Sequence, residues 1–110
     1  MSPIVYLNVG GCYFTTRSDT LQRGFFLGLV ASIDQEGMEV FVDRDPTHFR
    51  YILNWLRGVQ CLPEDDQTLS ELMCEADFYA LDDMVASIAV TKRRFSMPRT
   101  LNDIATSVRR

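Results

Sequence analysis

The chain has 110 residues and a mass of 12.6 kDa, a size that fits one domain with one ordinary core. Apolar residues make up 46% and charged residues 24% of the sequence, which excludes a chain that cannot build a core. Apolar runs stay shorter than the roughly 18 residues that a membrane helix needs, and the N-terminus lacks a signal-peptide pattern. We therefore expect a cytoplasmic protein without membrane insertion.

Charge is distributed unevenly along the chain. Residues 1–90 hold five basic and fourteen acidic residues, a net charge of −9, whereas residues 91–110 hold six basic residues and one acidic residue, a net charge of +5. Nucleic-acid binding needs Lys and Arg on the folded surface, so the acidic body argues against a nucleic-acid partner. The basic tail is expected to be solvated or to contact acidic partners.

The first half of the chain has the pattern of strands. Alternating apolar residues, the turn dipeptide Gly10-Gly11 and a second run rich in β-formers predict a β-hairpin over residues 4–16. Ser18 or Asp19 is expected to cap a short helix, and residues 38–42 read as another strand.

The second half has the pattern of helices. Asp45-Pro46 is expected to cap and open a helix that ends at Gly58. Residues 68–71 form a capping box that begins the next helix, and Asp82 or Asp83 caps a last short one. The apolar pattern fails after residue 90, which leaves a tail that is part helical or disordered.

The side chains that could carry chemistry are few and widely spaced. Cys12, Cys61 and Cys74 are an odd number without a close pair, and His48 is the only histidine. These spacings fit neither a disulfide framework nor a zinc site, and no motif places a nucleophile beside a base. We expect no enzyme activity, no metal and no cofactor.

Three ordered sequence blocks, residues 7–11, 41–58 and 75–81, together resemble a BTB/POZ domain of the potassium-channel tetramerisation-domain (KCTD) type. They read Leu-Asn-Val-Gly-Gly, Phe-Val-Asp-Arg-Asp-Pro continued by Ile-Leu-Asn-Trp-Leu-Arg-Gly, and Glu-Ala-Asp-Phe-Tyr-Ala-Leu. The resemblance covers residues 4–90, which leaves residues 1–3 as an extension and 91–110 as a basic tail.

The resemblance implies a fold and a function. The family fold is α/β (α+β), a small sheet with an N-terminal β-hairpin flanked by helices. Members have no catalytic activity and self-associate, as tetramers or pentamers. Many soluble members are adaptors that recruit a cullin-3 ubiquitin ligase. The alternative is the cytoplasmic tetramerisation domain of a potassium channel.

We expect the homo-oligomer interface to pair the hairpin and the Asp-Arg-Asp loop of one subunit with the next subunit. The residues predicted for it are Asn8, Arg17, Asp43, Arg44 and Asp45. Charges in such an interface set register more than affinity. Arg44→Glu is therefore expected to impair assembly and leave a folded monomer. The alternatives for residues 43–45 are an ion-pair cluster within the domain and a solvated loop with a helix cap.

Two further contacts are predicted. By the resemblance, Phe25, Phe26 and Leu27 are candidate cullin contacts. In the tail, Arg93, Ser96 and Pro98 resemble a basophilic-kinase phosphosite and a 14-3-3 docking motif.

Overall fold

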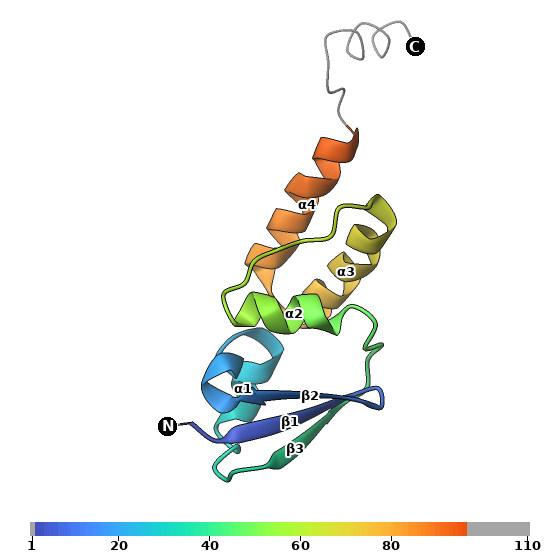
Figure 1. Ribbon diagram of the computed structural model, residues 1–110. Coiled ribbons are helices and arrows are strands. Elements are labelled where there is room, and N and C mark those ends of the chain that lie inside the picture. The colour runs from blue at the N-terminus through green and yellow to red at the C-terminus, as the bar shows by residue number, and fades with distance from the viewer. Residues whose placement is uncertain (1, 97–110) are drawn as a thin grey trace, which may run out of the picture.

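A three-stranded mixed sheet forms the base of the molecule (Figure 1). A computed structural model describes residues 2–96 and gives the strands as β1 (Ile4–Val9), β2 (Cys12–Arg17) and β3 (Met38–Val42). Their order is β2-β1-β3, with β2 antiparallel and β3 parallel to β1. Gly10 and Gly11 both have positive φ, as a two-residue hairpin turn of the primed type requires, so the predicted hairpin is confirmed.

Three short pieces replace the single short helix predicted after the hairpin. They are the 3-10 turns η1 (Ser18–Leu21) and η2 (Gly24–Phe26) and the one-turn helix α1 (Leu27–Val30). Gly24 has a φ of +60°, which is incompatible with a continuing right-handed helix.

The helix α2 (Phe49–Leu56) begins later than predicted. The Asp45 carboxylate accepts hydrogen bonds from the backbone N and the Oγ1 of Thr47, at 2.9 and 2.6 Å. A turn closed by Phe49 N donating to Pro46 O, at 3.0 Å, then leads into the helix. Asp45 therefore stabilises the turn before α2 instead of capping the helix itself. The predicted end at Gly58 is confirmed, with a φ of +89° just past the last turn.

The helices α3 (Asp66–Phe78) and α4 (Asp82–Ser96) complete the described chain. Asp65 caps α3 by accepting a hydrogen bond from Thr68 N at 2.8 Å, so the cap predicted at Thr68 is wrong by three residues. α4 continues past residue 90 to Ser96, and Lys92 Nζ lies 3.0 Å from Asp66 Oδ1 at the start of α3. The tail helix considered after residue 100 lies outside the described residues.

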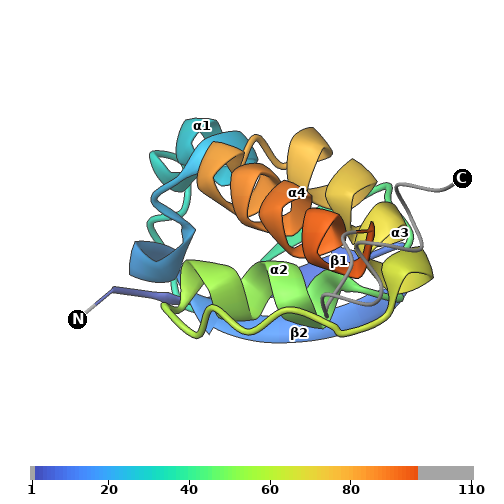
Figure 2. The same cartoon turned by 90° about the horizontal axis from the view of Figure 1, so that it is seen from above.

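The core lies between the sheet and the helices. The helices gather on one side of the sheet (Figure 1) and lie in front of it when the molecule is seen from above (Figure 2). The inward residues of β1 are fully buried, and a ring cluster packs against them. Its members are Phe14, Phe26, Phe49 and Tyr79, with centroid distances of 4.8 to 6.3 Å. The α/β expectation for the fold is confirmed. The opposite face of the sheet keeps several exposed side chains.

Candidate functional site

The hairpin turn packs directly on the loop between β3 and α2. Gly10 N donates a hydrogen bond to Val42 O at 2.9 Å, and Gly11 N donates to the Asn8 Oδ1 at 2.8 Å. A Cβ at residue 10 would lie 2.4 Å from Arg44 O, closer than two such atoms can approach. The loop can therefore sit on the turn only because residue 10 is glycine.

Arg44 joins this loop to α3 within the same chain. Its Nε and Nη2 donate to the two carboxylate oxygens of Glu75, at 3.1 and 2.7 Å, and its guanidinium lies 4.2 Å from the centre of the Phe78 ring. The Glu75 side chain is only 14% exposed. The hydrogen bonds with Glu75 raise the pKa of Arg44 above its usual value. Such a two-pronged pair fixes position as well as charge.

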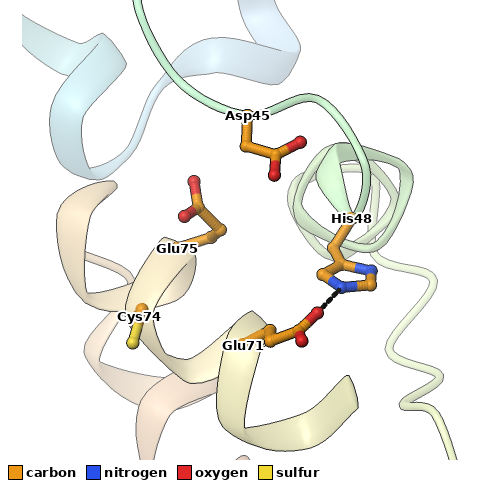
Figure 3. A pocket seen from close by; sticks show the side chains of 5 residues that line it. All are labelled: Asp45, His48, Glu71, Cys74 and Glu75. Atoms are coloured by element: carbon orange, nitrogen blue, oxygen red, sulfur yellow. Dashed lines mark hydrogen bonds and ion pairs between the residues drawn. The ribbon is translucent and has the colours of Figure 1, made fainter. Parts of the chain in front are cut away.

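A shallow acidic pocket of about 220 Å³ lies between this loop and α3, lined by Asp45, His48, Glu71, Cys74 and Glu75 (Figure 3). His48 Nε2 lies 2.7 Å from Glu71 Oε1, and this contact, with a further hydrogen bond from Gln67, lowers the pKa of Glu71. Hydrogen bonds from Thr47 lower the pKa of Asp45.

The pocket does not have the arrangement of a metal or catalytic centre. Within residues 2–96, no three His, Cys, Asp or Glu side chains are placed so that they could hold a metal ion. The Cys74 sulfur points away from His48, so the two do not form a nucleophile and base (Figure 3). Its acidic lining can instead contact basic groups on another protein.

The structure gathers four of the five predicted interface residues at one end of the sheet. Asn8 ends the outward face of β1, and Asp43, Arg44 and Asp45 follow β3. Arg17 lies at the other end, where it pairs in register with Ile4 and donates to Ser2 O at 2.9 Å. Because the Arg44 guanidinium is bonded inside the chain, Arg44→Glu would disturb the fold and not assembly alone.

The predicted cullin contacts differ in how exposed they are. Phe26 is buried in the ring cluster, whereas Phe25 is 36% and Leu27 55% exposed, so Phe25 and Leu27 are the accessible members. In the tail motif, Arg93 is exposed near the end of α4. The Ser96 side chain and Pro98 lie outside the described residues.

The sequence gives no signal for one contact between distant parts of the chain. Trp55 Nε1 donates to Asp83 Oδ2 at 3.1 Å, and Arg23 forms an ion pair with the same carboxylate. Burial raises the pKa of Asp83, but the hydrogen bonds from Arg23 and Trp55 outweigh it and hold that pKa below its usual value. The only sequence signal at Asp83 was its position as a helix cap, which says nothing of partners 28 and 60 residues away.

Comparison with known proteins decides the family. The family model described as BTB/POZ domain matches residues 5–88. The chain belongs to the BTB/POZ family. Human BTB/POZ domain-containing protein KCTD21 is 36% identical over 96 residues, which are 80% of this chain and 37% of KCTD21, so the predicted KCTD type is confirmed.

The names of two other relatives describe a function. The human BTB/POZ domain-containing adapter for CUL3-mediated RhoA degradation protein 2 is 40% identical over 89 residues, 74% of this chain and 28% of the adapter. The mouse potassium channel regulatory protein is 41% identical over 90 residues, 74% of this chain and 34% of that protein. The chain thus spans about a third of the length of these relatives. In residues 2–96, no helix is both long and apolar enough to cross a bilayer.

The BTB/POZ family is a family of protein-interaction modules without catalytic activity, and the relatives support an adaptor role of this kind.

Proposed function

We propose that this BTB/POZ chain self-associates into a closed ring and that this ring presents partners as an adaptor. The observation that carries the proposal is the placement of the candidate interface residues. Asn8, Asp43, Arg44 and Asp45 lie at one end of the sheet and Arg17 at the other. A head-to-tail ring needs two different patches on each subunit, and the placement of these residues at opposite ends of the sheet supports such an arrangement. A ring multiplies whatever each subunit binds.

The ring has an expected solution mass. Light scattering on a sizing column, run at several concentrations, should give about four or five times the chain mass of 12.6 kDa. Four copies agree with a tetramerisation domain and five with the pentamers of soluble relatives. A mass that stays at one copy up to the highest concentration would refute self-association.

The finer proposal is that the ring recruits a cullin-3 ubiquitin ligase in the cytoplasm. It is supported by the name of the human adapter and by the exposed pair Phe25 and Leu27. Leu27→Asp should weaken binding to the N-terminal region of cullin-3 about tenfold or more, because a charged side chain replaces an apolar one that the complex would bury. The measurement is a calorimetric titration with the matched control Val59→Asp, which alters an equally exposed apolar side chain elsewhere. Equal affinities for the two variants would remove Leu27 from the contact, and no heat with the wild-type chain would remove cullin-3 as a partner.

A second candidate is the cytoplasmic tetramerisation domain of a potassium channel, favoured by the likeness to the mouse potassium channel regulatory protein. The two candidates differ in the segments that flank the domain in the whole protein. A transcript that encodes membrane spans on the same chain would favour the channel domain over the adaptor.

The tail motif adds a proposed regulation. Arg93, Ser96 and Pro98 fit phosphorylation followed by 14-3-3 binding. Treating the chain with a basophilic kinase and finding no mass gain at Ser96 would exclude this role.

A further inference from the structure

The side of the sheet turned away from the helices carries large exposed aromatic side chains. The register of the strands places the outward side chains of β1, β2 and β3 side by side. Tyr13 is 59% and Phe41 61% exposed, and Tyr6 is exposed beside them. We call this surface the aromatic face, which comprises Tyr6, Asn8, Tyr13, Glu39 and Phe41. Aromatic groups clustered on a surface in this way mark a contact site.

The aromatic face is held in one arrangement before any partner binds. Tyr13 OH donates to the Glu39 carboxylate across β1, at 3.2 Å, and Asn8 Nδ2 donates to Tyr13 OH at 3.4 Å. Asn8 is itself fixed by the hydrogen bond from Gly11 N. Side chains that are already ordered lose less entropy on binding, so this face is prepared for a contact.

The charge near the aromatic face is negative. No Lys or Arg occurs in the sequence between Arg23 and Arg44, and β3 with its flanks carries Glu36, Glu39 and Asp43. The face therefore favours a partner that presents cations, and exposed tyrosine and phenylalanine rings attract guanidinium groups.

The same chain presents such cations on another surface. Of the five arginines in residues 2–90, Arg23 and Arg44 form ion pairs with carboxylates. Arg50 and Arg57 have no carboxylate partner in the part of the chain that the structure describes. Arg17 pairs in register with Ile4, which places it on the same side of the sheet as Tyr13. We call Arg50 and Arg57 the arginine edge.

The arginine edge lies at α2, beside β2. Arg50 and Arg57 are seven residues apart and so lie on one face of α2. Arg57 Nη2 donates to Thr15 O of β2 at 2.8 Å, and α2 lies beside β2 (Figure 2). The sheet therefore has carboxylates toward β3 at one edge and the arginine edge toward β2 at the other.

We propose that the aromatic face of one copy binds the arginine edge of the next copy. This inference rests on the proposed self-association and names the two surfaces that would meet. Two aromatic faces placed against each other would bring Glu39 and Glu36 close to their own copies, and like charges across an interface repel. Pairing the aromatic face with the arginine edge instead sets guanidinium groups against rings and carboxylates. Such a contact is head-to-tail, as a ring requires.

Two variants, each of which blocks one surface, test this contact. Phe41→Arg places a cation on the aromatic face, and Arg50→Glu places a carboxylate on the arginine edge. Both side chains are exposed, so the circular dichroism spectra and thermal unfolding of the variants should match those of the wild type. Each variant alone should dissociate at a concentration about 30-fold or more higher than the wild type. Mixed one to one, they should associate, because the intact surface of each variant fits the intact surface of the other. Val90→Arg and Arg93→Glu are matched controls that change the same kinds of side chain on α4, outside both surfaces.

Light scattering separates the outcomes. A wild-type ring with two monomeric variants that pair on mixing supports the contact. Variants that keep the wild-type mass, or that stay monomeric when mixed, overturn this contact while self-association through other surfaces stands. A wild-type chain that is itself monomeric refutes the proposed function and the contact with it.

Discussion

Arg44→Ala is expected to lower the free energy of unfolding by about 2 kcal/mol, measured by urea denaturation. The substitution leaves the Glu75 carboxylate, 14% exposed, without its partner and uncovers the Phe78 ring. Breaking a fully buried pair costs about 3–5 kcal/mol, and the 29% exposure of the Arg44 side chain reduces that value. In a chain of this length the thermal midpoint should fall by roughly 10 °C.

The partner substitution shows whether the pair is the cause. Glu75→Ala should cost a similar amount, and the double variant should cost clearly less than the sum of the two single variants, because it leaves no unpaired charge. Arg44→Lys keeps the charge but cannot donate to both carboxylate oxygens, so it should lie between the wild type and Arg44→Ala. Strictly additive effects of the two alanine substitutions would mean that the contact between Arg44 and Glu75 contributes nothing to stability.

The Arg44–Glu75 pair also affects what Arg44→Glu can show about assembly. Arg44→Glu would place two carboxylates where one ion pair now holds the loop to α3. A loss of the ring in that variant would then follow from a disturbed fold. Substitutions at the exposed Asp43, which follows β3 without entering the Arg44–Glu75 pair, test the interface more directly.

Local signals in the sequence predicted the elements well. The alternation in residues 4–9 and the dipeptide Gly10-Gly11 determine the hairpin through neighbouring residues, and the apolar stripe of α2 does the same for its buried face. The starts of α2 and α3 were harder to place. The carboxylates of Asp45 and Asp65 each accept a hydrogen bond from the backbone N of a threonine two or three residues later. The same bond can stabilise a turn or cap a helix, so it does not determine where the helix begins.

The contacts that shape the candidate site could not be predicted locally. Arg44 and Glu75 are 31 residues apart, so their spacing carries no signal. The sequence predicts one short helix after the hairpin, and the resemblance makes its Phe26 a candidate cullin contact. The break at Gly24 turns the chain there, and the ring enters the core instead. The charge asymmetry between the two sheet edges depends on the strand order β2-β1-β3, which no local pattern in the sequence determines.

Gly24→Ala is expected to be the most damaging single-methyl change in the described chain. A Cβ at this position would lie 2.1 Å from Tyr79 O, the carbonyl that accepts a hydrogen bond from Phe25 N at 2.9 Å. The φ of +60° adds the cost of left-handed backbone, about 1–2 kcal/mol for alanine. Because Tyr79 is fully buried at the centre of the ring cluster, it cannot move aside cheaply. We expect a total loss of about 3 kcal/mol or more, measured by urea denaturation.

Substitutions at two other glycines distinguish the two causes of this loss, the contact with Tyr79 O and the left-handed backbone. Gly11 also has a positive φ, but a Cβ there would meet no atom within 4 Å, so Gly11→Ala should show the backbone cost alone. Gly28 has open space around it and no left-handed backbone, so Gly28→Ala should change stability by no more than about 0.5 kcal/mol. If Gly24→Ala does not fold well enough for denaturation, its soluble yield beside that of Gly28→Ala gives the same ranking. Equal stability of the Gly24 and Gly11 variants would mean that the chain relieves the contact with Tyr79 O, and that the turn after η1 does not depend on this close approach.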